Sequence, residues 1–452
     1  MGVIYSPTST PNPYPQGGGE RFGEQRRGAC PGLSTPMPTG DGLLARLLPI
    51  GTIPLAAFAE LMAASRAYGH GIVEVTSRGS IQARGLSPRS APHFAATVGE
   101  LGIAAADGVP VLTNPLAGLD AQELFDAAGF AANLREALAL AGLAEKLDAK
   151  ISIAIDGGGQ LDLDALAADI RLRAEMRDGA TVLRIGLGGD AAGAVQLGTV
   201  APAHGQEAAL RLLGVLALKG RAARARDNVA SEGSDVFRAA LRDLLDPAAP
   251  GERGSELTEA RRLRKNPIGE YVLKDGFFAR GIGLAFGHAD ASALEQLVEE
   301  AAAAGATGVR TAPGRALLVL GLDQQNLSHF AGRAERLGFV VDPADPRRFV
   351  VACAGAPVCP SAQFATRTIA PDIATAVARF LSDTCAVHLS GCAKGCAHAA
   401  AAALTVIGTA DGCALVADGT VRDKPFAAVE PNQLPSTIAH LLGARGRGAV
   451  HA

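Results

Sequence analysis

Five of the seven cysteines of this 452-residue chain lie between Cys353 and Cys396, close enough in sequence to serve one site. Two pairs have a spacing that could do chemistry: five residues separate Cys353 from Cys359, and three separate Cys392 from Cys396. Glycines beside the second pair free the backbone around its thiols. Four thiolates on irregular backbone can converge on a 4Fe–4S cluster. These four residues are therefore predicted to be cluster ligands, which would make the chain a redox protein.

Other interpretations of the cysteines stay open. Structural zinc sites use cysteine pairs that are two to four residues apart, so a longer gap that contains Pro357 fits zinc poorly. Cys385 and Cys413 lie in apolar, strand-like surroundings and are expected to be core residues. Cys30 is either a ligand or reactive thiol, or a structural residue of a Gly-Pro turn, and we favour the turn.

Length and charge exclude several classes of protein. A chain of this length is expected to form two or three domains. The formal net charge of −3 provides no basic field for nucleic acid. No uncharged apolar run is long enough to span a membrane, and no signal peptide is evident. We therefore expect a cytoplasmic protein with no nucleic-acid or membrane partner, and a disordered tail over residues 1–25.

The elements that must position the cysteines come from an internal repeat. Gly51–Gly102 aligns without a gap with Gly287–Gly338, and both copies contain a His-Phe-Ala triplet and a Gly-Leu pair. Each copy predicts helix, strand, strand and helix, the pattern of a ferredoxin-like unit. The predicted helices are Leu55–Tyr68 and Ala291–Ala304, and the predicted strands are Ile72–Thr76, Ile81–Arg84, Gly308–Thr311 and Ala316–Leu320.

Each copy is followed by an α/β stretch, of which only the second has cysteines. Asp148–Asp156 is the expected counterpart of Thr384–Ser390, the strand that precedes Cys392. The fold is therefore predicted to be α+β, with duplicated ferredoxin-like half-domains, a cleft between them and two α/β lobes. The predicted domains are a tail (1–25), a first half (26–110), a first lobe (111–218), a linker or helical segment (219–270), a second half (271–345) and an iron–sulfur lobe (346–452).

The motif around the cysteines resembles that of the sirohaem-containing nitrite and sulfite reductases. Pro360-Ser-Ala follows the first pair, and His388-Leu-Ser-Gly precedes the second. Thr76-Ser77-Arg78-x3-Gln82 is similar to the Thr-Thr-Arg-x3-Gln of that family, and Leu147-x2-Lys150 to its Leu-Pro-x-Lys-Phe-Lys. The resemblance implies an internally duplicated fold with a 4Fe–4S cluster beside a tetrapyrrole.

The sequence departs from these reductases where they hold the carboxylates of sirohaem. Ser152 replaces the second lysine of the Lys-Phe-Lys motif, and no Arg-Asn precedes Asn114-Pro115. Removing a cationic partner from a buried carboxylate costs about a few kcal/mol for each contact. The pocket is therefore expected to be reshaped.

A narrower resemblance explains this change. Arg26–Leu33 and Pro36–Leu44 resemble the opening signature of the precorrin-3B synthase family, and the run from His388 to His398 fits it too. The resemblance implies an oxygen-dependent monooxygenase of aerobic cobalamin biosynthesis. Such an enzyme converts precorrin-3A to precorrin-3B by meso-carbon hydroxylation and ring A lactone formation. The alternatives are a sirohaem-dependent nitrite or sulfite reductase and a non-catalytic electron carrier.

The family also implies further cofactors and partners. A mononuclear non-haem iron is expected to activate dioxygen, and His388 and His398 are its only candidate ligands, although either could simply be a packed or exposed side chain. Electrons are expected to come ultimately from NADH or NADPH through a partner reductase. The Gly-rich run Gly186–Ala191 superficially resembles a dinucleotide loop, but no long helix follows, so it predicts a hairpin turn.

Cationic side chains are the expected partners of an anionic tetrapyrrole. Arg78 and Lys150 match the family motif in register, whereas the remaining candidates could equally be surface charges. The sequence singles out no catalytic residue. The complete set of predicted substrate-binding residues is Arg78, Lys150, Arg46, Arg84 and Lys394.

Overall fold

The computed structural model describes residues 31–106, 108–246, 266–378 and 387–448. The tail predicted for residues 1–25, as well as Cys30 and Cys385, lies outside these residues. Within them, no helix is both long and apolar enough to cross a membrane.

Two five-stranded sheets with the same strand order form a central domain. Residues of the two repeat copies occupy matching positions in both sheets, so the duplication predicted from the sequence is present in the fold. The strands are, in order, β1 (Met37–Thr39), β2 (Gly42–Leu47), β5 (Ile81–Leu86), β4 (Ile72–Val75) and β13 (His288–Asp290) in one sheet, and β11 (Gly269–Val272), β12 (Phe278–Gly283), β15 (Ala316–Leu322), β14 (Gly308–Ala312) and β3 (Ile53–Pro54) in the other.

The predicted helices of the repeat are confirmed almost to the residue. Helix α1 spans Leu55–Tyr68 and α7 spans Ala291–Ala303, while α2 (Ser90–Glu100) and α8 (Gln324–Arg336) follow the second strands. Gly305, which comes just after α7, has a φ of +84°, a conformation that favours glycine and helps to end a helix. The periodicity of apolar residues therefore located these elements correctly.

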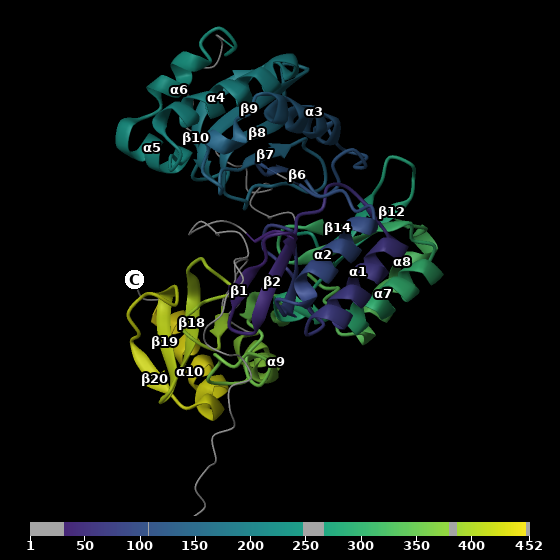
Figure 1. Cartoon of the computed structure of the whole chain (residues 1–452), viewed down its shortest axis with the longest axis vertical. Coiled ribbons are helices and arrows are strands. Elements are labelled where there is room, and N and C mark those ends of the chain that lie inside the picture. Colours follow the sequence, from purple (N-terminus) through teal and green to yellow (C-terminus); the bar gives the residue numbers. More distant parts are fainter. Residues whose placement is uncertain (1–30, 107, 247–265, 379–386, 449–452) are drawn as a thin grey trace, which may run out of the picture.

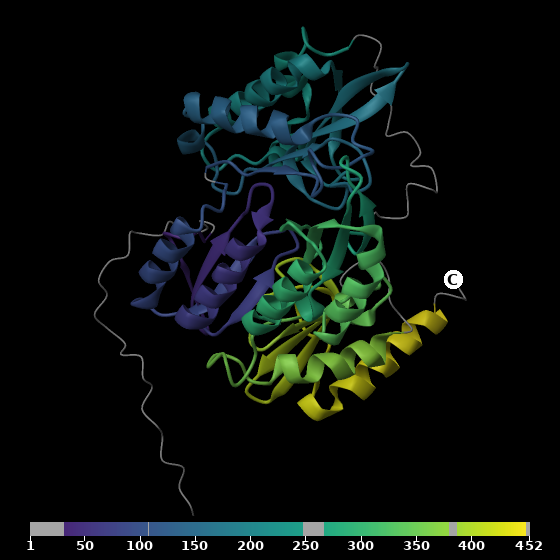
Figure 2. The same cartoon turned by 90° about the vertical axis from the view of Figure 1, so that its right-hand side faces the viewer.

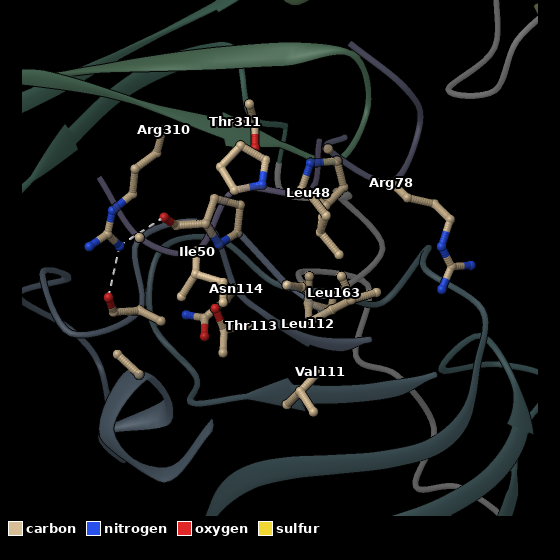
Figure 3. A pocket seen from close by; sticks show the side chains of 18 of the residues that line it. Leu48, Ile50, Arg78, Val111, Leu112, Thr113, Asn114, Leu163, Arg310 and Thr311 are labelled. Carbon is tan, nitrogen blue, oxygen red and sulfur yellow. Dashed lines mark hydrogen bonds between the residues drawn. The ribbon is translucent and has the colours of Figure 1, made fainter. Parts of the chain in front are cut away.

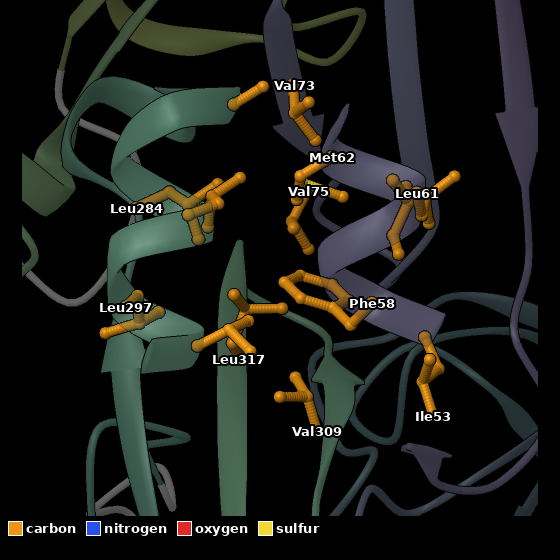
Figure 4. Close-up of a cluster of buried hydrophobic side chains, with 14 of the residues drawn as sticks. Ile53, Phe58, Leu61, Met62, Val73, Val75, Leu284, Leu297, Val309 and Leu317 are labelled. Carbon is orange, nitrogen blue, oxygen red and sulfur yellow. The ribbon is translucent and has the colours of Figure 1, made fainter. Parts of the chain in front are cut away.

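The two halves exchange their edge strands. Strand β13 of the second half pairs with β4 of the first, and β3 of the first half pairs with β14 of the second. One hydrophobic core also joins the halves, and Figure 4 shows Phe58 and Met62 of α1 in the same cluster as Leu297 and Leu317 of the second half. The halves therefore form a single domain rather than two.

A lobe of the same topology follows each half. In each lobe the first three strands are parallel and the last two are antiparallel to their neighbours. Figures 1 and 2 show the first lobe at the top and the second at the bottom, with the central domain against both. The first lobe contains β6 (Val111–Thr113), β7 (Ile153–Asp156), β8 (Ala168–Arg177), β9 (Ala180–Gly189), β10 (Val195–Val200) and helices α3 (Ala127–Leu140) and α4 (Gly205–Lys219). The second contains β16 (Val350–Ala352), β17 (Val387–Ser390), β18 (Ala402–Thr409), β19 (Gly412–Gly419), β20 (Ala427–Val429) and helices α9 (Thr366–Val377) and α10 (Leu434–Gly448).

Residues 219–270 were predicted to be a linker or helical segment, and the described part of this segment begins with two helices. Its first part forms α5 (Ala225–Glu232) and α6 (Asp235–Ala240), which pack on the first lobe. Phe237 and Leu241 are fully buried in the core of that lobe, so the segment belongs to it despite its high density of charge. The predicted hairpin is present, because β9 and β10 pair antiparallel, but its turn lies at residues 190–194 and Gly186–Gly189 belong to β9.

Candidate functional site

Two neighbouring parallel strands bring the two cysteine pairs to one edge of the second lobe. Cys353 follows β16 directly, and Cys392 comes two residues after the end of β17. The backbone N–H of Gly391 donates a hydrogen bond to the Cys353 Sγ at 3.1 Å. The carboxyl ends of adjacent parallel strands thus place the first thiol of each pair side by side.

The other two thiols, of Cys359 and Cys396, interact electrostatically with the first two. Burial raises the pKa of Cys359, and the charges of Cys353 and Cys392 add to the increase. Burial likewise raises the pKa of Cys396, with contributions of the same sign from Cys353 and Cys392, while Arg84 opposes them. The structure therefore gathers the four cysteines that were predicted from their spacing.

The backbone packs closely around these thiols at glycine positions. A Cβ atom added at Gly40 would lie 2.6 Å from the Cys359 Sγ, and one at Gly391 would lie 2.6 Å from the Ala362 Cβ. Gly395 has a φ of +66° and approaches Val421, which also excludes a larger residue. Glycine is thus required wherever the chain approaches a cysteine. The thiol set, with an N–H bonded to sulfur, fits a 4Fe–4S cluster.

A single zinc ion fits the site less well. In the part of the chain that the structure describes, no three His, Cys, Asp or Glu side chains could hold one metal ion. The thiols of a 4Fe–4S cluster surround a cube of atoms, so they do not need to meet at one point. The 4Fe–4S cluster therefore stays the prediction that the cysteine spacing makes for this site.

A buried ion network lies beside the thiols. Arg84 has a side chain only 2 % exposed, and its Nε and Nη2 donate to the two oxygens of Asp41 at 2.9 and 2.7 Å. Its Nη1 donates to both oxygens of Glu74 at 3.3 Å. Arg84 was predicted to bind substrate. In this structure its guanidinium is enclosed and already holds two carboxylates, which argues against that role.

The pKa values within the network reflect competition between burial and charge. Burial opposes ionisation of Asp41, but the hydrogen bonds and charge of Arg84 hold its pKa below the ordinary value. Burial raises the pKa of Glu74, and Arg84 offsets only part of that increase. With its amide oriented to satisfy both neighbours, Gln82 donates to Glu74 and accepts from the Arg46 Nε at 2.8 Å. The predicted residue Arg46 is therefore linked to this network.

The remaining predicted cations lie at the surface. Lys394 is exposed on the cysteine loop, and its Nζ donates to the Ser361 Oγ at 3.3 Å. Lys150 is exposed in a turn before β7. Cys413, predicted to be a core residue, is fully buried in β19, where burial raises its pKa to about 11.

His388 and His398 lie together but do not form an iron site. Their ring centroids are 5.7 Å apart, and both ring nitrogens of the buried His388 lack a hydrogen-bond partner among the described residues. The Nη2 of Arg315 lies 3.2 Å from the His398 Nδ1, so a fixed positive charge stands where a metal ion would bind. With no carboxylate completing a triad in the described ranges, these residues do not fit a mononuclear iron.

A second buried histidine, His288, predicts a pH effect on stability. Burial lowers the pKa of His288 to about 3, and its Nε2 has no hydrogen-bond partner among the described residues. Between pH 6.5 and 3 the unfolded state therefore binds more protons than the folded state, so stability falls as the pH drops below about 6.5. From pH 8 to 5.5 we expect His288 to contribute a loss of about 1 kcal/mol.

The variant His288→Phe, which keeps a ring, tests this effect. Its free energy of unfolding in urea should depend less on pH over this range than that of the wild type, by about the same 1 kcal/mol. Equal pH dependence of the two proteins would show that His288 does not titrate as expected.

The first lobe and the central domain line a partly open pocket with a cavity volume of about 120 Å³. Figure 3 shows Arg78 and Arg310 on opposite sides of it, with Asn114 and leucine side chains between them. Arg78, predicted from the family motif, donates to the Ser152 Oγ at 3.1 Å and to the Ala167 carbonyl at 2.9 Å. An apolar interior with cations at its edge suits an apolar ligand that carries peripheral acids.

Several of these residues were not predicted from the sequence. Asp41 and Glu74 hold Arg84 across large separations along the chain, a relation that no local motif reveals. Arg310 could have been found from the repeat, because it aligns with Glu74 of the first copy. Arg135, on α3, has no comparable signal.

Comparisons with known proteins agree with this geometry. No family model matches the chain. It is 37% identical over 417 residues to a precorrin-3B synthase from a Sinorhizobium species, covering 92% of this chain and 88% of that protein. It is 31% identical over 126 residues to a ferredoxin–nitrite reductase from Synechococcus elongatus, covering 26% of this chain and 25% of that protein. The fold is similar to that of the NirA protein of Mycobacterium tuberculosis, with a TM-score of 0.66 at 19% identity, covering 88% and 79% of the two chains.

Proposed function

The chain belongs to the precorrin-3B synthase family, and from this we propose that it converts precorrin-3A to precorrin-3B. The reaction is an oxygen-dependent hydroxylation of a meso carbon, accompanied by formation of the ring A lactone, in aerobic cobalamin biosynthesis. The protein is accordingly an oxidoreductase.

The observation that carries the proposal is the set of four thiols at the edge of the second lobe. Cys353, Cys359, Cys392 and Cys396 would hold a 4Fe–4S cluster, which supplies electrons one at a time when bound. The Gly391 N–H stabilises negative charge on the Cys353 sulfur, and the glycines around the thiols keep bulky side chains away. The role of these residues is to hold an electron relay, and the substrate binds elsewhere.

The pocket beside the first lobe is the proposed place of the tetrapyrrole. Arg78 lies in its wall, and Lys150 is close in sequence to Ser152, which Arg78 contacts. Ser152 stands where the reductase motif has a lysine. Its hydroxyl is a neutral hydrogen-bond partner of Arg78, so Arg78 supplies the positive charge at this position. Dioxygen is the second substrate, and a partner reductase that draws on NADH or NADPH is the proposed electron donor. The mononuclear iron that the family implies has no fitting ligand set among the described residues.

A turnover assay tests the proposal directly. Purified protein supplied with precorrin-3A and a chemical reductant should form precorrin-3B under air and leave the substrate unchanged under nitrogen. Mass spectrometry would detect the gain of oxygen, and labelled dioxygen would identify its source. Absence of turnover under air with an intact cluster would refute the assignment.

The alternative is a sirohaem-dependent nitrite or sulfite reductase, supported by the partial similarity to a ferredoxin–nitrite reductase. Visible spectroscopy of anaerobically purified protein separates the two. Intense sirohaem absorption together with reduction of nitrite or sulfite would favour the alternative. A broad iron–sulfur absorption without sirohaem bands supports the synthase. An electron carrier would leave both kinds of substrate unchanged.

A further inference from the structure

The chain is duplicated, so each position in the second lobe has an equivalent in the first. The pocket between the first lobe and the central domain lies at the position equivalent to that of the cysteine site. Asn114 follows β6 as Cys353 follows β16. The N–H of Gly157 donates to the Asn114 Oδ1 at 3.2 Å, just as the N–H of Gly391 donates to the Cys353 Sγ at 3.1 Å. The two lobes therefore present the same backbone frame with an amide in one and a thiol in the other.

The strand that faces each of these two sites carries a charge of opposite sign: it is negative beside the cysteines and positive beside the pocket. Glu74 of β4 aligns with Arg310 of β14, so a carboxylate near the thiols becomes a guanidinium beside the pocket. The Nε of Arg310 donates to the Thr52 Oγ1 at 2.9 Å, and its Nη1 donates to the carbonyls of Pro115 and Ala117 at 3.2 and 2.8 Å. All of these partners are neutral.

Arg310 is partly buried, and its side chain makes no ion pair with another described residue. Burial lowers its pKa to about 10, and the more distant charge of Glu123 opposes that decrease. A partly buried cation that loses hydration without gaining a counter-ion is unfavourable, and an anionic ligand would remove that penalty. Its remaining donors, on Nη2, have no protein partner in the described ranges and are available to a ligand.

Arg135 of α3 adds a second guanidinium to the pocket wall. Its Nη2 donates to the Val111 carbonyl at 2.8 Å, and its Nε is buried without a hydrogen-bond partner among the described residues. Burial lowers its pKa, as expected for a cation without a neighbouring carboxylate. Arg135, Arg310 and Arg78 thus come from three separate segments to line one pocket.

We propose that Arg310 and Arg135 bind carboxylate groups of a tetrapyrrole whose macrocycle lies on the leucine side chains of this pocket. Paired N–H donors of guanidinium groups match the two oxygens of a carboxylate, and the ligand supplies the missing counter-charge. Leu48, Leu112 and Leu163 supply the apolar surface (Figure 3). That the ligand is a tetrapyrrole rests on the proposed function. That it carries carboxylates rests on the arginines of the pocket.

Binding of a fluorescent porphyrin with acetate and propionate side chains on its rings tests the proposal. The full-length protein with its cluster is titrated anaerobically, and Arg310→Met and Arg135→Met are each expected to raise the dissociation constant about tenfold to a hundredfold. Arg310→Lys should recover part of the loss. The control Arg333→Met removes a cation from a partly exposed ion pair with Glu300, on a helix that does not line the pocket, and should bind like the wild type.

A second probe separates ligand binding from a structural role, because Arg310 also holds the Pro115 and Ala117 carbonyls. The same porphyrin with neutral amide side chains should bind equally to the wild type and to Arg310→Met. An equal loss of both probes, or unchanged binding of the acid in a folded Arg310→Met protein, would overturn the proposal.

The outcome for this pocket is separable from that of the proposed function. If precorrin-3A is not converted but the acid porphyrin still needs Arg310, the assigned reaction fails and the carboxylate site stands. If conversion occurs and Arg310→Met changes neither the KM for precorrin-3A nor porphyrin binding, the site fails alone. An increase in KM with little change in kcat is the result expected for a residue that anchors the substrate.

Discussion

Replacing Cys392 with alanine is expected to remove the iron–sulfur cluster and, with it, all oxygen-dependent turnover. Each of the four thiols supplies one ligand, and a cluster with an open corner is exposed to loss of iron and to oxidation. The N–H···S contact beside Cys353 cannot replace a missing thiolate, because it stabilises charge without binding metal. Iron and acid-labile sulfide per chain, visible absorption and conversion of precorrin-3A should all fall to background together.

Cys413→Ala provides the matched control for this experiment. Cys413 lies in the same lobe, is fully buried in β19 and belongs to the hydrophobic core rather than to the group of four. This variant should keep its iron, its sulfide and its turnover. If the Cys392→Ala protein retained full turnover, the relay role of the cluster would be refuted.

Replacing Arg84 with methionine should cost about 3–5 kcal/mol of stability, the largest loss expected from any single ion pair of the described structure. The substitution preserves most of the volume but leaves Asp41 and Glu74 buried without their common counter-ion. Urea denaturation monitored by circular dichroism gives the free energy of unfolding for comparison with the wild type.

Two further variants show whether uncompensated charge causes that loss. Arg66→Met breaks an exposed ion pair with Glu295 and should cost only about 0–1 kcal/mol. Adding Asp41→Asn and Glu74→Gln to Arg84→Met should restore a large part of the stability, because neutral amides tolerate burial far better than carboxylates. A small loss in the Arg84→Met protein would contradict the enclosed network.

Local patterns in the sequence predicted the central domain well. The apolar period of Leu55–Tyr68 gave a helix with the observed bounds, and the repeat gave a second copy of the same elements. The spacing of the cysteines, such as that between Cys353 and Cys359, identified the group of four that the fold brings together. These features could be predicted because residues close together in the sequence determine them.

Features that depend on distant residues were not predicted. Arg84 looked like a ligand-binding cation, yet residues 10 and 43 positions away in the chain neutralise it. Residues 219–246 were predicted to be a surface helix and linker because they are rich in charge, and only the buried positions of Phe237 and Leu241 show that they pack into the first lobe. Composition reports the average polarity of a segment, but burial depends on which face the rest of the chain covers.

The exchanged edge strands constrain how the chain can acquire its structure during synthesis. Strand β4 can pair with β13 only after His288–Asp290 has left the ribosome. In the same way, β3 (Ile53–Pro54) can pair with β14 only after Gly308 has been synthesised. The N-terminal half must therefore emerge with an open sheet edge and half of a hydrophobic core, both of which promote aggregation. We expect this central domain to fold late, slowly and as one unit, since its closing contacts join residues far apart in sequence. The duplication has left neither copy able to complete its fold alone.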